Sequence, residues 1–209
     1  MFTDLSGSLI AVFIVSLVLS LSIHEAMHGF AAHWLGDDTA QLEGRLTLNP
    51  LAHIDLATTI LLPTILVILH LPPILAAKPV PFNPERVKWD EYGAALIGIA
   101  GPLTNLLLAA VAALALRAFG AGASSFFNNA LVLFTSVNVG LFAFNMIPIP
   151  PLDGSRLLYA FAPEPLQDIM RQIEAMGFMV ILFILLFAFP LISGPLNSVY
   201  TAILNFLLG

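Results

Sequence analysis

Residues 8–35 form one apolar stretch that is long enough to cross a lipid bilayer as a single helix. About 20 helical residues span a hydrocarbon layer of about 30 Å. The rest of the chain is similar, because 59% of its 209 residues are apolar and only 10% are charged, against about a quarter in average soluble domains. A soluble domain of this size needs more polar groups to cover its surface. The sequence therefore predicts one membrane-embedded domain over residues 1–209.

Charge and cysteine content exclude several other classes of protein. The net charge is −6 and the seven Lys and Arg residues are scattered, so we expect no nucleic-acid binding. The chain has no cysteine, which excludes disulfide scaffolds, iron–sulfur clusters and thiolate zinc sites. We also expect no cleaved signal peptide, because no cationic stretch precedes the first apolar run and helix-compatible sequence continues far past it.

The apolar segments predict an all-α polytopic membrane protein with about five to six hydrophobic segments. Residues 8–35, 92–119 and 126–147 are the expected core helices. Two C-terminal segments follow within residues 176–208; the first ends near residue 189, and the second, from residue 196, is short enough to lie in the membrane interface. Residues 56–71 are also apolar, but they are short and contain a proline.

Three polar stretches, residues 36–55, 72–90 and 148–171, contain six of the seven cations. The positive-inside rule places all three on the cytoplasmic side. Residues 56–71 then make no net crossing and form a re-entrant segment; an ordinary tilted span is the alternative. The alternating residues 45–48 (RLTL) and the five prolines of residues 72–90 predict short extended or β segments near the cytoplasmic face, where an unpaired strand edge could accept another extended segment.

The motif HEAMH lies within the first apolar stretch. In a helix, His24 and His28 are about 40° apart on one face and one turn apart, so both imidazoles can reach one metal ion. Glu25 lies beside that face, where a carboxylate can act as a base. Leaving two histidines and a glutamate unpaired in an apolar helix would cost several kcal/mol, which favours a liganded site.

A catalytic zinc site needs a third protein ligand. His33 does not fit, because it lies about 140° around the helix from His28. Asp153 is preferred, since it follows a proline-broken helix end within an apolar bundle, where a lone carboxylate favours a cation. If residues 56–71 make no net crossing, Asp153 also lies on the same side as the histidines. The other candidates are loop carboxylates: Asp37, Asp38, Glu43 and Asp55.

Three ordered motifs, HEAMH, AGPLTN (residues 100–105) and FNMIPIPPLDG (residues 144–154), resemble the site-2 protease family of intramembrane zinc metalloproteases, in its short branch without a PDZ domain or the extra leading helix of some relatives. The resemblance implies one Zn²⁺ held by His24, His28 and Asp153, with zinc-activated water attacking the scissile carbonyl and Glu25 as general base and acid. It also implies that Asn145 positions or polarises the substrate and that Asn105 lines the same core.

Other interpretations of these residues stay open at this stage. Asn105 could be a structural polar group, and His53 could contact the substrate, support the site from behind or have no such role. Gly101 and Pro102 fit either the first turn of a helix or a close helix contact. Asn138 lies on the same helix face as Asn145 and could be an interhelical hydrogen-bonding group.

The family resemblance also sets expectations for partners and location. The expected substrates are single-pass transmembrane proteins or leftover signal peptides, cleaved within the membrane as regulated intramembrane proteolysis or as clearance. The expected location is a prokaryotic cell membrane, in contact with lipid, with the active site open to the cytoplasm and a homodimer as one option. The alternatives are a zinc transporter and a catalytically silent homologue that binds membrane proteins.

Overall fold

The computed structural model describes residues 7–53, 80–177, 180, 183 and 187–209, and its regular elements are all helical. No β-strand occurs in these ranges. The predicted re-entrant segment, residues 56–71, lies outside them, as does half of the predicted helix at residues 176–189. The helices are α1 (Gly7–Trp34), α2 (Thr39–Leu42), η1 (Pro50–His53), η3 (Pro84–Arg86), α4 (Asp90–Phe119), η4 (Gly120–Gly122), α5 (Ser125–Asn145), α6 (Gly154–Phe161), α7 (Glu164–Ala175) and α9 (Phe189–Leu208).

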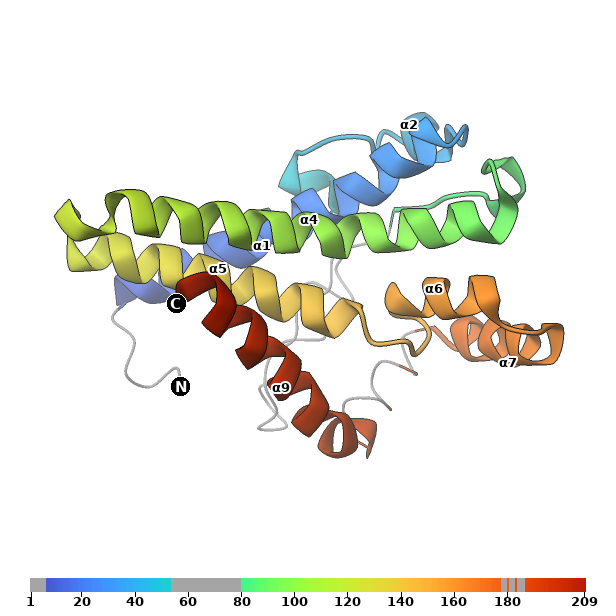
Figure 1. The fold of residues 1–209 in the computed structure, drawn as a ribbon. Helices are drawn as coiled ribbons and strands as arrows, with labels where there is room; N and C mark the ends of the chain where they lie inside the picture. The colour runs from blue at the N-terminus through green and yellow to red at the C-terminus, as the bar shows by residue number, and fades with distance from the viewer. Residues whose placement is uncertain (1–6, 54–79, 178–179, 181–182, 184–186) are drawn as a thin grey trace.

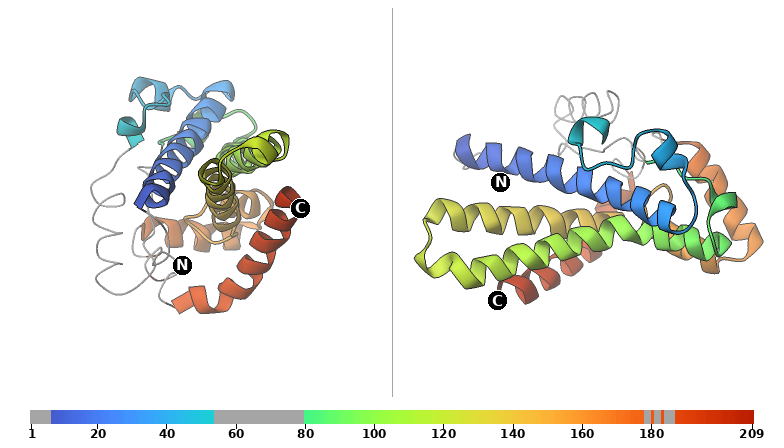
Figure 2. Two further views of the ribbon diagram at one scale, coloured as in Figure 1. Left: turned by 90° about the vertical axis from the view of Figure 1, so that its left-hand side faces the viewer. Right: turned by 90° about the horizontal axis from the view of Figure 1, so that it is seen from above.

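Helices α1, α4 and α5 pack against one another in pairs and form the centre of the molecule (Figures 1 and 2). The antiparallel helices α4 and α5 are joined by η4, and α9 crosses over α5. Helix α6 packs against the N-terminal part of α4, beyond the end of α5 (Figure 1). The α4–α5 turn therefore lies at one end of the bundle, and helices α2, α6 and α7 lie at the other.

Four described helices are long and apolar enough to cross a membrane: α1, α4 with η4, α5 and residues Pro190–Leu208 of α9. The three predicted core helices are confirmed to within two residues at each end. The chain is therefore an integral membrane protein. Its central helices approach closely because the buried face of α4 consists largely of small residues, including Gly98, Gly101 and Ala109, which let helix backbones come together in lipid.

Two sequence-based expectations about regular structure are wrong. Residues 189–208 form one helix of 20 residues, not a break followed by a short interfacial segment, because Pro190 lies in the first turn, where its missing N–H costs nothing, and proline inside a membrane helix is tolerated. Residues 45–48 form no strand: the buried Arg45 side chain donates to the carbonyl of Ala52 at 2.5 Å, and the Thr47 amide donates to the carbonyl of Arg45. These two hydrogen bonds thus lie within the loop, and neither is made to a partner strand.

Residues 80–83, which we call the strap, run beside α1 without regular structure. The backbone N–H of Asn83 donates to Asp37 Oδ2 at 2.6 Å, just beyond the end of α1. The N–H of Lys88 donates to the carbonyl of Leu35 at 2.9 Å. These two hydrogen bonds attach the chain that enters α4 to the C-terminal end of α1.

Candidate metal centre

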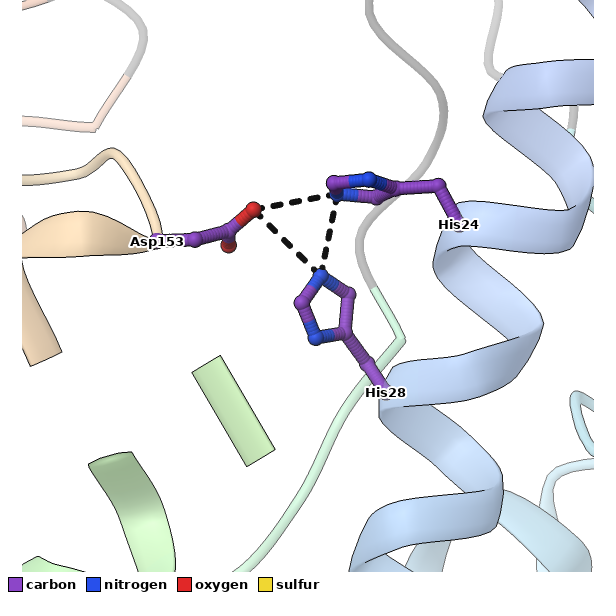
Figure 3. Close-up of side chains that lie close together, drawn as sticks. All are labelled: His24, His28 and Asp153. Atoms are coloured by element: carbon purple, nitrogen blue, oxygen red, sulfur yellow. Dashed lines mark hydrogen bonds and ion pairs between the residues drawn. The ribbon is translucent and has the colours of Figure 1, made fainter. Parts of the chain in front are cut away.

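Helix α1 directs His24 and His28 from successive turns toward Asp153, the residue just before α6 (Figure 3). Asp153 Oδ2 is 3.0 Å from His24 Nε2 and 3.4 Å from His28 Nε2, and the two Nε2 atoms are 3.1 Å apart. The three side chains come from segments 129 residues apart in the chain. One face of a single helix and one loop carboxylate thus converge on a point.

The turn that brings Asp153 back to α1 depends on a residue without a side chain. Helix α5 ends at Asn145, and the segment from Met146 to Asp153 reverses the chain. A Cβ atom at Gly154 would lie 2.3 Å from the carbonyl oxygen of Met146, so no residue with a side chain fits at this position. Three prolines at positions 148, 150 and 151 prevent α5 from continuing into this turn.

The spacing of the three ligand atoms fits a tetrahedral metal ion. Zinc bonds to histidine nitrogen and carboxylate oxygen of about 2.0–2.2 Å place ligand atoms roughly 3.3–3.6 Å apart at the corners of a tetrahedron. The separations of 3.0, 3.1 and 3.4 Å in this structure lie close to those values. Two histidines and one carboxylate also form a donor set typical of catalytic zinc, with one corner left for water.

The second ring nitrogen of His28 determines how that imidazole can bind a metal. His28 Nδ1 is 2.7 Å from the backbone carbonyl oxygen of Ile97 on α4. A carbonyl oxygen only accepts hydrogen bonds, so Nδ1 carries the proton, and Nε2 of the neutral ring presents its lone pair to the site. Such a partner fixes both the tautomer and the ring orientation of a metal ligand.

A longer chain of hydrogen bonds sets the tautomer of His24. Asn138 donates to the carbonyl of Phe134 at 2.9 Å, and its own Oδ1 accepts from Asn105 Nδ2 at 3.0 Å. Asn105 Oδ1 then accepts from His24 Nδ1 at 2.5 Å. This series of hydrogen bonds begins at a backbone carbonyl oxygen, which can only accept, so each of the two side-chain amides has one possible orientation. His24 Nδ1 therefore carries a proton, and His24 Nε2 is left with a lone pair toward the site. Asn138 thus connects α5 to the metal centre through α4.

Gly101 of α4 leaves the space in which the two imidazoles meet. A Cβ atom there would lie 2.5 Å from His28 Nε2 and 2.7 Å from His24 Nε2. Pro102 lies inside α4, not in its first turn. The close-contact interpretation of Gly101 is therefore the one that the structure supports, and the contact is with the histidine side chains.

Glu25 and Asn145 lie on the wall of the same cavity, which has a volume of about 310 Å³. Glu25 Oε2 accepts a hydrogen bond from the backbone N–H of Val80 at 3.0 Å. Asn145 donates one hydrogen bond to the carbonyl of Leu141 in its own helix at 3.1 Å. The other residues along the cavity are Leu21, His24, His28, Val80, Phe82, Ile97, Gly98, Leu141, Phe144, Pro151, Leu152, Asp153, Arg156 and Glu174.

Two other predicted site residues do not line this cavity. Asn105 is fully buried behind His24, so the structure places it as a support for a histidine rather than as a wall that a substrate could contact. His53 is buried in η1, where its Nε2 is 2.8 Å from the carbonyl oxygen of Thr47. Its position braces the loop before it.

Two of the described loop carboxylates, Asp37 and Asp38, have partners of their own, and Glu43 is exposed and not on the cavity wall. Asp37 accepts hydrogen bonds from Thr39 and from the strap; burial alone would raise the pKa of Asp37, but these hydrogen bonds outweigh it and lower that pKa. Asp38 pairs with His33 at 2.6 Å. Asp55 lies outside the described residues. Asp153 is the carboxylate that the structure places with the two histidines.

Sequence reasoning missed the residues that the cavity takes from other elements. Val80 and Phe82 come from the strap, while Arg156 on α6 forms an ion pair with Glu174 on α7. The Arg156 guanidinium also lies 5.4 Å from the centre of the Phe82 ring. The sequence offered one signal for Arg156, which is its position three residues after Asp153. Both residues lie at the start of one short helix, so Arg156 is close to the candidate metal ligand.

Comparisons with known proteins agree with this site. The sequence model of Peptidase family M50 matches residues 117–189. The chain is 38% identical to "Putative zinc metalloprotease YwhC" of Bacillus subtilis over 195 residues, which are 88% of this chain and 83% of the relative. It is 28% identical to "Putative zinc metalloprotease Rip2" of Mycolicibacterium smegmatis over 187 residues, which are 86% of this chain and 69% of that relative. No solved structure matches the chain.

Both relatives are named as zinc metalloproteases. The structure brings together the residues that such an enzyme needs: two histidines of an HExxH helix, the glutamate between them and a distant aspartate, within a bundle of candidate membrane-spanning helices. The similarity to the Bacillus subtilis relative covers 88% of this chain. The chain belongs to peptidase family M50, the site-2 protease family, and is a zinc metalloprotease of that family.

Proposed function

We propose that this zinc metalloprotease cleaves peptide bonds within the transmembrane segments of membrane proteins, including leftover signal peptides. The observation that carries the proposal is the position of His24 and His28, which lie on a helix long and apolar enough to span the membrane, while Asp153 reaches them from the turn after α5. One Zn²⁺ per chain would be held by His24, His28 and Asp153. An ion at this depth is reached by a peptide that is itself in the membrane.

Glu25 and Asn145 have different roles in the proposed reaction. Bound zinc would supply an acidified water and polarise the scissile carbonyl. Glu25, on the cavity wall beside the ligands, takes the proton of the attacking water and passes it to the leaving amine. Asn145, on the same wall, has a second amide N–H that can donate to the developing oxyanion, a contribution of about 10²-fold in rate.

The distribution of charge supports a site that opens to the cytoplasm. Five of the described cations belong to loops or helices at the α6–α7 end of the bundle: Arg45, Arg86, Lys88, Arg156 and Arg171. Arg117 lies near the opposite end of α4. By the positive-inside rule, the α6–α7 end faces the cytoplasm. In a prokaryotic cell membrane, the cavity beside α6 would then admit water from that side.

A substrate helix hides its carbonyls in its own hydrogen bonds, so its cleavage requires local unwinding. The strap offers an irregular backbone beside the cavity, and an unwound substrate could lie along it as an extended segment. We expect single-pass proteins or signal peptides with helix-breaking residues near the cytoplasmic face to be cut most readily, because their unwinding costs least.

The experiment is cleavage of a panel of transmembrane segments and signal peptides by the purified, zinc-loaded protein in lipid nanodiscs. Glu25→Gln should abolish cleavage while zinc content stays at one ion per chain. Glu43→Gln, on an exposed loop carboxylate, is the control and should retain wild-type cleavage. Full activity of Glu25→Gln would remove Glu25 from the role of base.

Two further outcomes would replace the proposal. Zinc uptake by vesicles that contain the wild-type protein, without cleavage of any segment, would indicate a transporter. Binding of transmembrane segments by the zinc-loaded wild type, again without cleavage, would indicate a catalytically silent homologue.

A further inference from the structure

The carboxylate of Glu25 is held by a group from a distant part of the chain. The backbone N–H of Val80 donates to Glu25 Oε2 at 3.0 Å, across a separation of 55 residues. Among the described residues, Glu25 Oε1 makes no hydrogen bond. One oxygen of the carboxylate is thus fixed by the strap, and the other is left for proton transfer.

Val80 is held in this position by packing and by the rest of the strap. Its side chain lies over Gly29, one helical turn after Glu25, where a Cβ atom would come within 3.3 Å of Val80 Cγ1. At the other end of the strap, Asn83 is bound to Asp37. Prolines at positions 81 and 84 restrict the backbone of the strap, because each proline fixes its own φ and limits the residue before it.

The orientation of Glu25 needs such a support. On a helix, Glu25 is rotated by about 100° from His24, so its side chain leaves α1 toward the strap and not directly toward the ligand atoms. A glutamate has three rotatable bonds, and fixing them costs entropy unless a partner holds the carboxylate. A misplacement of about 1 Å in a catalytic group can cost about 10²-fold in rate.

We propose that the Val80 amide is a positioning group that orients Glu25 for proton transfer, so that the strap is part of the catalytic apparatus. This inference rests on the proposed function, because it assigns Glu25 the role of base. It implies that the hydrogen bond exists whether or not the protein cleaves anything, and that its removal slows turnover without loosening the metal.

The first experiment tests the hydrogen bond by amide exchange. Between residues 79 and 84, only Val80, Phe82 and Asn83 carry an exchangeable backbone N–H. In the full-length protein without metal, Glu25→Ala should speed exchange at Val80 by about tenfold and leave Asn83 unchanged, whereas Glu25→Gln, which retains an acceptor oxygen, should preserve protection at Val80. Equal Val80 exchange in wild type and Glu25→Ala would overturn the proposal.

The second experiment removes the donor alone. Incorporation of the α-hydroxy acid analogue of valine at position 80 replaces the N–H by an oxygen and keeps the side chain. We expect kcat to fall by about tenfold or more, with KM and zinc content within about twofold of wild type. The same replacement at Leu48, on an exposed loop outside the cavity, is the control and should change kcat by less than about threefold.

The outcomes of the two experiments are distinct. An unchanged kcat in the Val80 ester variant, or an equal loss in the Leu48 ester variant, would overturn the positioning role. A loss of zinc together with kcat would also overturn it, since the strap would then support the metal site and not Glu25. A wild-type protein that cleaves no segment would refute the proposed function itself, while the exchange experiment would still report whether the hydrogen bond is present.

Discussion

Replacing Gly101 by alanine should impair zinc binding, because the added methyl group occupies the space between the two imidazoles. The new Cβ would lie 2.5 Å from His28 Nε2 and 2.7 Å from His24 Nε2, whereas ordinary contact begins at 3.4 Å. The two nitrogens must therefore retreat by about 0.9 and 0.7 Å. Metal-ligand bonds tolerate deviations of only about 0.2 Å, so at least one histidine ligand is lost.

The size of the effect follows from the energy of one ligand. Four-ligand zinc sites bind with about 10–16 kcal/mol, or about 2.5–4 kcal/mol for each ligand. Loss of one ligand should therefore weaken zinc binding by roughly 100- to 1,000-fold. Competition against a chromophoric chelator, with the purified protein in nanodiscs, measures this affinity without any reference to cleavage.

Gly140→Ala provides the matched control. Gly140 also lies in a membrane-spanning helix, but the nearest atom to its added Cβ would be a ring carbon of Tyr200 at 3.9 Å, an ordinary contact. This variant should bind zinc like wild type. Wild-type zinc affinity in Gly101→Ala would refute the geometry of the metal centre, because the methyl group and the two histidines could not then share the space that the structure assigns to them.

Three other predictions test the residues around the ion. Asp153→Ala should lower zinc content, measured by elemental analysis, while Asp168→Ala on exposed α7 should not; unchanged stoichiometry in the first would direct the ligand search back to the loop carboxylates. Asn138→Leu should weaken zinc binding by about 10- to 100-fold by ending the hydrogen-bond chain to His24, with Ser136→Ala of the same helix as control, and equal affinities would contradict that chain. The lowered pKa of Asp37 means that its contribution to stability is present above its unfolded pKa of about 3.9 and is lost as the pH falls through the folded value. Thermal unfolding of the metal-free protein should therefore lose stability below about pH 4, and Asp37→Asn should flatten this dependence; parallel curves for the two proteins would contradict it.

Hydropathy and helical periodicity predicted the parts of this protein that depend on local sequence. The three core helices lie where their apolar stretches indicated, because a segment in lipid must satisfy its own backbone hydrogen bonds. His24 and His28 share a helix face for the same local reason. Residues 45–48 failed as a strand, because an alternating pattern does not reveal whether a partner strand exists.

The role of Asn105 could not be derived from spacing. Its hydrogen bond to His24 joins residues 81 positions apart, and a polar residue in an apolar helix has no sequence feature that distinguishes a substrate contact from a support for a ligand. The Val80 amide was missed for a related reason, since every residue except proline carries a backbone N–H and only its location selects one of them.

The amino-acid sequence by itself determined the solvent of this protein, the positions of its core helices and the pair of imidazoles on one turn-spaced face, since each depends on composition or on neighbours within a few residues. Only the tertiary structure decided that Asp153 reaches this pair, that α4 and α5 orient its rings and that the strap holds Glu25. These contacts depend on how closely α1 and α4 approach at Gly101, where one added methyl group would come about 0.7–0.9 Å too close to the imidazoles. Helix packing sets this separation, and no local pattern encodes it.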